Sequence, residues 1–228
     1  MKNLDVIYED NHIIVVKKQP NIPSQADKTE DMDMLTLIKE YIKEKYNKQG
    51  NVYLGLVHRL DRPVGGVMVF AKTSKAASRL SDQVREKIFK KKYLAVVDGK
   101  FDNITGTLED YLYKDERNNI SKVVSKDKKN SKLAKLDYEV LAYNELKNLS
   151  LVNVNLHTGR HHQIRVQLSH AGHSIFGDQK YGTRGQGKQI ALWAYELTIQ
   201  HPTSKEEMTF KGLPESNGTW CIIRDLDI

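Results

Sequence analysis

Residues 149–165 read LSLVNVNLHTGRHHQIR, and this stretch decides much of the expected fold. From Leu149 to Leu156, apolar residues alternate with asparagines, a pattern typical of a strand with one buried face. A turn follows at Gly159. Apolar residues at helical spacing then predict a helix that begins near Arg160 and is closed by Gly172. A strand that leads through a glycine turn into a helix is thus the first structural unit that the sequence indicates.

Similar patterns occur on both sides of this unit. Strands are expected at 6–8, 13–16, 67–70, 93–97 and 190–199, and amphipathic helices at 33–46 and 74–88, the second capped by Ser74. Strands and helices alternate irregularly, and several neighbouring strands are hairpin-like. The sequence therefore predicts an α+β fold, a mixed and mostly antiparallel central sheet with flanking helices, in a single domain over residues 1–228. The polar region 114–135 is expected to form mobile loops around short strands.

The composition narrows the class of partner. The chain has 228 residues with a formal net charge of +7, which favours nucleic acid or an anionic membrane as partner. No stretch approaches the roughly 20 apolar residues that span a bilayer, and the N-terminus lacks the apolar core of a signal peptide. Cys221 is the single cysteine, so an intrachain disulfide is excluded. We therefore expect a cytoplasmic protein that acts without a membrane.

Residues 58–62 read HRLDR and contain the first candidate for chemistry. The positive charges of Arg59 and Arg62 favour the ionised form of Asp61 between them. A carboxylate can serve as a nucleophile or as a general base. An aspartate beside arginine is more often a surface ion pair, so the local sequence leaves both interpretations open.

A run of three lysines precedes a tyrosine at residues 90–93. Lys90, Lys91 and Lys92 could contact phosphate, while the ring of Tyr93 could stack on an unpaired base. The alternative is a solvated charge run followed by a tyrosine of the core. This stretch alone does not separate the two.

The third candidate is the helix start in residues 157–165. Free N–H groups at a helix N-terminus suit phosphate, and Arg160 and Arg165 add positive charge there. A basic helix end that serves solubility alone is one alternative. Zinc binding by the nearby histidines is another. Gly159 breaks the helix between His157 and His161 and no cysteine or glutamate is close, so we predict no metal site.

Taken together, these segments resemble the RluA-type pseudouridine synthases over nearly the whole chain. The resemblance rests on HRLDR (58–62), GVMVFAKT (66–73), KYLA (92–95), HTGRHHQIR (157–165), GHSI (172–175) and GDQKYG (177–182). Each is a weak signal alone, but their order and separation are specific. The resemblance implies an isomerase that breaks the bond between uracil N1 and ribose C1′ and rejoins the base through C5. No metal, nucleotide or redox cofactor is implied, and the sequence shows no glycine-rich nucleotide loop.

The resemblance also implies residue roles. Asp61 matches the nucleophile, Arg165 its ion-pair partner, and Tyr93 the ring that stacks on uracil. Arg59 matches a residue that fills the space left by the flipped base. The expected phosphate contacts are Lys90, Lys91, Lys92 and Arg160. The substrate class is structured RNA, with ribosomal and transfer RNA both open, and we expect a monomer that needs no obligatory protein partner.

Two departures from the family pattern stand out. Many relatives carry an N-terminal RNA-binding domain of the S4 type, whereas this chain begins at the first expected hairpin. RNA selection is then expected to fall to the catalytic domain. The segment after this hairpin reads KQPN (18–21) where relatives often have Lys-Pro-x-Gly. A rival hypothesis is an RNA-binding protein of the same fold without catalysis, but Asp61, Tyr93 and Arg165 are all present.

Overall fold

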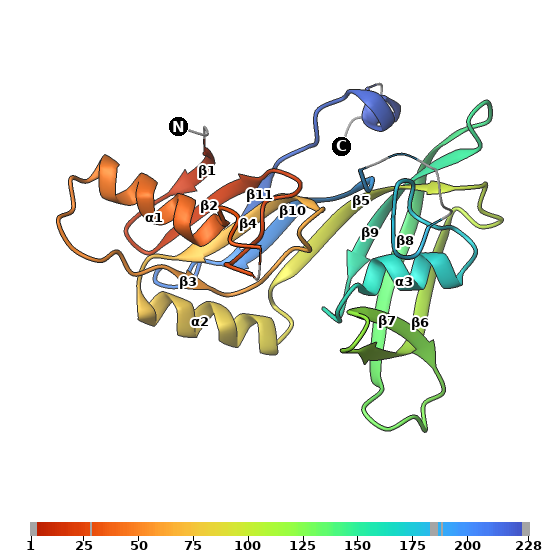
Figure 1. Ribbon diagram of the computed structural model, residues 1–228, viewed down its shortest axis with the longest axis horizontal. Helices are drawn as coiled ribbons and strands as arrows, with labels where there is room; N and C mark the ends of the chain where they lie inside the picture. The colour runs from red at the N-terminus through yellow and green to blue at the C-terminus, as the bar shows by residue number, and fades with distance from the viewer. Residues whose placement is uncertain (1–3, 28, 183–186, 188, 225–228) are drawn as a thin grey trace. The chain divides into compact units, whose positions relative to one another are not determined.

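The computed structural model describes residues 4–27, 29–182, 187 and 189–224, and it divides the chain into two compact units (Figure 1). The first unit comprises Met1–Lys91 and Ala194–Leu213, and the second comprises Lys92–Trp193 and Pro214–Ile228. The expectation of a single domain stays a prediction.

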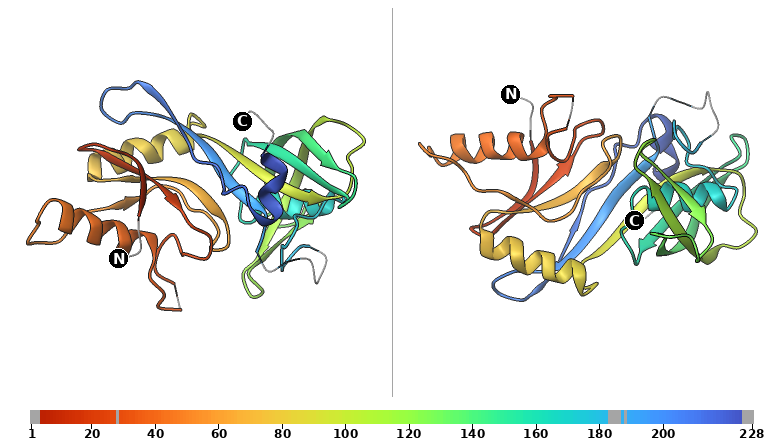
Figure 2. Two further views of the ribbon diagram at one scale, coloured as in Figure 1. Left: turned by 90° about the horizontal axis from the view of Figure 1, so that it is seen from above. Right: turned by 60° about the horizontal axis from the view of Figure 1, so that its bottom comes forward.

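The first unit is a sheet between two helices. Its strands are β1 (Asp5–Glu9), β2 (Ile13–Lys18), β3 (Gly55–Leu56), β4 (Gly65–Ala71), β10 (Leu192–Gln200) and β11 (Glu207–Lys211). The order is β1-β2-β4-β10-β11, with β3 also paired to β4. Its helices, α1 (Met34–Lys45) and α2 (Ser74–Arg85), lie on opposite sides of this sheet (Figure 2). The apolar run of β2, Ile13 to Val16, is fully buried, as expected for a strand covered on both faces.

Both helices of this unit begin at a capping side chain. Asp33 accepts hydrogen bonds from the N–H groups of Leu35 and Thr36 and so caps α1. In α2 the cap is Thr73, which accepts from the N–H of Ala76, so the assignment of Ser74 as cap is wrong by one residue. Both residues have a suitable hydroxyl, and only the backbone path decides which of them lies outside the helix.

Gly66 allows close contact between β4 and β10. Its φ of +133° lies in the range that favours glycine, and a Cβ there would lie 2.2 Å from the carbonyl oxygen of Ala194. A larger residue would force the two strands apart. Gly66, near the start of β4, therefore has a packing reason.

The second unit holds a purely antiparallel set of strands. These are β5 (Lys90–Asp98), β6 (Thr105–Asp115), β7 (Ile120–Val124), β8 (Lys132–Asn144) and β9 (Leu149–Leu156), in the order β5-β9-β8-β6-β7. β5 begins within the first unit. Helix α3 (Gln163–His170) lies against β6 and β7, and a short 3₁₀ helix covers Gly218–Ile223. The predicted α+β class with a mostly antiparallel sheet is confirmed.

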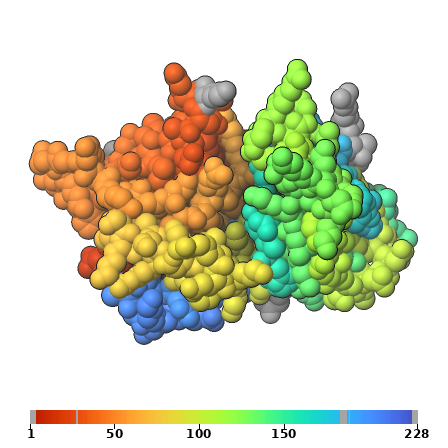
Figure 3. Space-filling view, turned by 90° about the horizontal axis from the view of Figure 1, so that it is seen from below, coloured from red at the N-terminus to blue at the C-terminus, as the bar shows by residue number. Residues whose placement is uncertain are grey.

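The basic region 114–135 is more regular than expected. It contains the end of β6, all of β7 and the start of β8, and β6 and β8 are long strands of 11 and 13 residues. The expectation of a short strand between loops holds for β7, which has five residues, whereas β6 and β8 are longer because they pair with each other over eight successive positions that lie mostly outside this region. Polar side chains on one strand face are compatible with this pairing. The connection 125–131 is mostly exposed, and the green segments of Figure 3 form part of the outer surface of this unit.

Helix α3 begins three residues later than predicted. His162 precedes it with a φ of 53°, a left-handed conformation that breaks the helix from Arg160. The end is as predicted: Ala171 is the C-cap and Gly172 follows with a φ of +87°. The backbone reversal at His162 is a tertiary feature that helical spacing does not reveal.

Candidate active site

Asp61 lies half-buried in a tight turn just before β4. Its carbonyl oxygen accepts a hydrogen bond of 2.9 Å from the N–H of Val64. Ser24 binds both main-chain groups of Leu60, the residue before Asp61. Its hydroxyl donates to the Leu60 carbonyl and accepts from the Leu60 N–H. The backbone that carries the candidate nucleophile is therefore fixed by bonds that do not use its carboxylate.

Lys18 is a buried cation beside this turn, and sequence reasoning missed it. Its side chain is fully buried, and Nζ donates to the carbonyls of Gln19, Arg62 and Val64 at 3.2, 3.0 and 2.7 Å. Burial lowers the pKa of Lys18 to about 7, while the charge of Asp61 acts in the opposite direction. A lysine at the end of the apolar run IIVVKK was the signal that could have revealed it.

The two arginines that flank Asp61 lie in different environments. Arg62 binds a loop of the first unit, where it contacts Asp31, the hydroxyl of Thr29 at 2.8 Å and Asp27 at 3.5 Å. Arg59 is exposed, as a residue that reaches RNA would have to be. The local sequence places both arginines beside the Asp61 carboxylate, but the structure gives Arg62 two other acidic partners, Asp31 and Asp27.

His58 links the first candidate segment to the second. Its Nε2 accepts a hydrogen bond of 3.1 Å from the N–H of Val69, and its ring contacts the Phe89 ring edge-on at 5.0 Å. Burial, aided by the charge of Lys91, lowers the pKa of His58 to about 3, so the imidazole is neutral at physiological pH. The Nζ of Lys91 lies over the ring of Phe89, 5.8 Å from its centre. His58 is thus a neighbour of Phe89 and Lys91 in space.

The three lysines of the second segment differ in exposure. Lys90 is exposed and lies 3.4 Å from Glu207, whereas Lys91 and Lys92 are half-buried. Burial lowers the pKa of Lys91. Tyr93 is opposite Val154 in the pairing of β5 with β9 and is 6% exposed. The phosphate contacts proposed for the lysines and the stacking role of Tyr93 stay predictions.

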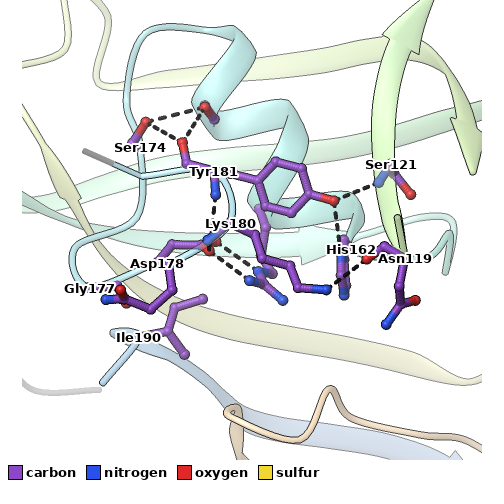
Figure 4. A network of polar contacts seen from close by, with 12 residues as sticks. Asn119, Ser121, His162, Ser174, Gly177, Asp178, Lys180, Tyr181 and Ile190 are labelled. Atoms are coloured by element: carbon purple, nitrogen blue, oxygen red, sulfur yellow. Dashed lines mark hydrogen bonds and ion pairs between the residues drawn. The ribbon is translucent and has the colours of Figure 1, made fainter. Parts of the chain in front are cut away.

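Arg165 forms a two-point ion pair in the second unit with Asp178, which is labelled in Figure 4. Its Nε and Nη2 donate to the two carboxylate oxygens of Asp178 at 2.7 and 2.6 Å, and both side chains are buried. Burial alone would raise the pKa of Asp178, but the hydrogen bonds and charge of Arg165 outweigh it and hold this pKa below its usual range. Sequence reasoning missed Asp178, although it lies in the quoted stretch GDQKYG. The pairing of Arg165 with Asp61 stays a prediction.

Tyr181 connects this ion pair to the neighbouring hairpin. Its ring lies 5.2 Å from the guanidinium carbon of Arg165. Its hydroxyl accepts from the N–H of Ser121 in β7 at 2.6 Å and lies 2.8 Å from Nδ1 of His162. His161 stacks on His162 at 3.7 Å between ring centres. Helix α3, β7 and the turn 178–182 therefore share one polar network.

Arg160 and the remaining histidines of the third segment lie nearer the surface. Arg160 is exposed, and its Nε donates to the carbonyl of Leu133 at 2.9 Å. His157 pairs with Asp137. In the described parts of the chain, no group of three or more His, Cys, Asp or Glu is arranged to hold a metal ion. Within those same residues no helix has the length and apolar character needed to cross a bilayer.

Comparison with known proteins gives a consistent picture. The model of the RNA pseudouridylate synthase family matches residues 12–170. YjbO of Bacillus subtilis (strain 168), described as an uncharacterized RNA pseudouridine synthase, is 34% identical over 215 residues, which are 93% of this chain and 73% of that protein. Ribosomal large subunit pseudouridine synthase D of Borreliella burgdorferi is 32% identical over 206 residues, 88% of this chain and 61% of the relative. The chain thus spans between 61% and 73% of the length of these two relatives.

A solved structure shows the same fold. Human RNA pseudouridylate synthase domain containing 1 has a TM-score of 0.76 at 23% identity, covering 94% of this chain and 84% of that one. The ordered sequence segments, the match of the family model and the fold agree. This chain therefore belongs to the RNA pseudouridylate synthase family, as its resemblance to the RluA type implied.

Proposed function

We propose that this chain isomerises uridine to pseudouridine in structured RNA, with Asp61 as the nucleophile. The observation that carries the proposal is the position of Asp61. Its carboxylate extends from a half-buried turn whose backbone is held by Lys18 and Ser24 through bonds to the neighbouring residues. A nucleophile whose backbone is held in place before the substrate arrives has less conformational freedom to lose during the reaction.

The reaction balances without an external reagent. The bond between N1 and C1′ breaks, the base turns, and a bond between C5 and C1′ forms. C5 loses a proton, N1 gains one, and the Asp61 carboxylate is released unchanged. Because substrate and product are isomers, no oxidant or reductant is consumed.

The other proposed roles follow the charges of the site residues. Arg165 orients the Asp61 carboxylate and keeps it ionised, because a guanidinium favours the charged form of a neighbouring acid. Tyr93 stacks on the uracil after the base has left the RNA stack. Arg59, Lys90 and Arg160 are exposed cations that are suited to phosphate or to the vacated base position, and Lys91 and Lys92 complete the proposed contacts.

Ribosomal RNA is the first substrate to test. Transfer RNA remains the second candidate, since both are structured RNAs. The Borreliella relative is named for the large ribosomal subunit, and this favours ribosomal RNA for the present chain. Pseudouridine maps of both RNA classes, from cells with and without the gene, would identify the modified position.

Substitution of the proposed nucleophile tests the mechanism. Asp61→Asn should abolish pseudouridine formation in RNA from cells that lack the gene, because an amide cannot act as the nucleophile. The RNA affinity of this variant should stay within about 3-fold of wild type. Asp82→Asn changes a half-exposed carboxylate on α2 that pairs with Arg85, and this control should keep full turnover. Turnover by Asp61→Asn would refute the mechanism. A wild-type chain that binds RNA without modifying any of it would support the rival RNA-binding function.

A further inference from the structure

Asp178 is buried and holds one edge of the Arg165 guanidinium. Its side chain is 0% exposed, and both carboxylate oxygens accept hydrogen bonds from Arg165, at Nε and Nη2. Two parallel bonds fix the rotation of a planar guanidinium, whereas a single bond would leave it free to turn. This contact leaves the Nη1 group of Arg165 to other partners.

The carboxylate is itself fixed by its own turn (Figure 4). Its Oδ1 also accepts from the N–H groups of Lys180 and Tyr181 at 2.9 and 3.2 Å. The Asp178 carbonyl accepts from the N–H of Gly182 at 2.9 Å, and a Cβ at Gly182 would lie 2.6 Å from that oxygen. The compact turn 178–182 therefore sets the direction of the carboxylate before Arg165 binds to it.

A second brace acts on the same guanidinium from its face. The Tyr181 ring lies 5.2 Å from the guanidinium carbon, a distance that suits a cation–π contact. The Tyr181 hydroxyl accepts from the N–H of Ser121 and lies 2.8 Å from Nδ1 of His162, so the ring is held at its outer end. The Tyr181 carbonyl accepts from the hydroxyls of Ser169 and Ser174, which fixes the backbone that carries the ring. Edge and face of the guanidinium are thus both held by residues of one turn.

We propose that Asp178 is a positioning residue of the reaction, which fixes the orientation in which Arg165 meets the catalytic carboxylate. Stability alone is a weak reason for this pair, because well-packed apolar residues often replace a buried ion pair without loss of stability. The inference rests on the proposed role of Arg165. It assigns Asp178 no contact with substrate.

The first test separates turnover from binding. Asp178→Asn should lower kcat by about 100-fold, because an error of about 1 Å in the position of a catalytic group has an effect of this order. The KM and the RNA affinity should change by less than about 3-fold, since the proposed phosphate contacts are elsewhere. The measurements are a steady-state assay of pseudouridine formation at varied concentrations of RNA from cells that lack the gene, and a separate measurement of RNA binding.

Asp110 offers a matched control. It is a carboxylate of the same unit that holds the same helix, through Gln167 at 2.8 Å and His170 at 3.3 Å. Asp110→Asn should lower the stability of the helix but leave kcat within about 2-fold of wild type. A folded Asp178→Asn protein with wild-type kcat would overturn the proposal, and so would an equal loss of kcat in both variants.

A spectroscopic test does not depend on activity. The Nε–H resonance of Arg165, assigned by its loss in Arg165→Lys, should show slow exchange with water in the wild type because this proton is buried and bonded to Asp178. We expect the protection to disappear in Asp178→Asn and to persist in Asp110→Asn. Protection that survives in Asp178→Asn would show that Asp178 does not hold the guanidinium.

A double-mutant cycle shows whether Asp178 acts through Arg165. In an Arg165→Lys background, the effect of Asp178→Asn on kcat should shrink to within about 3-fold. A general structural role would give the same loss in both backgrounds and would overturn the inference. If Asp178→Asn does not fold, Asp178→Glu keeps the charge but displaces it by one methylene. It should fold with a lowered kcat, and wild-type kcat in that variant would again overturn the inference.

These results can be told apart from a failure of the proposed function. If Asp61→Asn stays active, the assignment of the nucleophile is wrong, whatever Asp178 does. The Nε–H exchange of Arg165 still decides whether Asp178 holds this arginine. A normal Asp61→Asn result combined with wild-type turnover in Asp178→Asn would refute only the positioning role.

Discussion

At the scale of single residues, the site depends on charged groups that are buried. Lys18 is fully buried, yet three main-chain carbonyls surround its ammonium group, and two of them, those of Arg62 and Val64, belong to the Asp61 turn. An ammonium has three N–H donors, so each carbonyl can receive one. This lysine therefore connects the end of β2 to the loop that carries the proposed nucleophile.

Removal of this cation should loosen the turn. Lys18→Met leaves three carbonyls without their donor, and buried unsatisfied groups cost about 1–3 kcal/mol each, partly offset because no charge is buried any longer. We expect the free energy of unfolding to fall on the order of 2 kcal/mol and kcat to fall at least 10-fold. Urea denaturation would measure the first effect and an assay of pseudouridine formation the second. Amide exchange at Val64, whose N–H binds the Asp61 carbonyl, would show whether the turn loosens.

The adjacent residue supplies the control. Lys17 forms an ion pair with Asp5 at 2.6 Å and stays partly exposed. Lys17→Met should change stability by less than about 1 kcal/mol, as is usual for exposed pairs, and should leave kcat unchanged. Equal effects of the two substitutions would argue against a special role for Lys18.

At the scale of elements, one carboxylate joins the first hairpin to α1 and to the end of β4. Glu9 accepts hydrogen bonds from Lys45, Lys72, Tyr41 and Tyr46 at 2.7, 2.6, 3.1 and 2.9 Å. Burial raises the pKa of Glu9, but the hydrogen bonds from Lys45 and Lys72 outweigh burial and bring it down to about 2. The docking of α1 thus depends on an ionised Glu9.

The stability that Glu9 supplies should depend on pH. The folded-state pKa, about 2, lies below the ordinary value of 4.5, so the unfolded chain binds more protons between these limits. The contribution of ionised Glu9 to the free energy of unfolding is then complete above pH 4.5, and it is lost as the pH falls through about 2. Glu9→Gln should lower the free energy of unfolding on the order of 2 kcal/mol at pH 7, with a smaller difference at pH 3.

Urea denaturation of wild type and variant at both pH values would test this. Glu207→Gln is the matched control, because Glu207 and its partner Lys90 are each about 60% exposed and 3.4 Å apart. That substitution should change stability by less than about 0.5 kcal/mol at either pH. A Glu9→Gln effect that grows as the pH is lowered would contradict the assigned pKa direction.

At the scale of the whole molecule, the net charge of +7 should govern RNA affinity. Each phosphate contact on single-stranded RNA contributes about −0.7 to the slope of log affinity against log salt. The variant with Lys126, Lys128 and Lys129 changed to Gln removes three exposed charges from the basic connection 125–131. If these lysines contact phosphate, the slope should become shallower by about 2. Filter binding across a salt series would measure it.

The control for this prediction changes the net charge equally but elsewhere. Lys43, Lys48 and Lys75 are exposed lysines of the first unit, outside the segments proposed to contact RNA. Their replacement by Gln should leave the slope nearly unchanged. Equal slopes for the two triple variants would show that the basic connection has no special role in RNA binding.

The sequence by itself determined six of the strands, the three α-helices and the family. The hairpin over 5–18, the helix at 34–45 and the strand at 149–156 follow from local periodicity, because an alternating or helical pattern records which face of an element is buried. The order of the quoted segments also indicated the family that the comparisons confirm. Errors of one to three residues, at Thr73 and His162, arise where several residues can end an element and the chain path selects one.

Only the tertiary structure decided which partners the buried charged groups bind. Lys18 reaches the carbonyl of Val64, 46 residues away, and Arg165 reaches Asp178, 13 residues away beyond the end of its own helix. Neither partner lies at a spacing that helical or strand periodicity predicts. A periodic pattern reports only burial, whereas an ion pair requires that two backbone segments bring particular atoms within about 3 Å of each other. The path of the chain in three dimensions sets that distance.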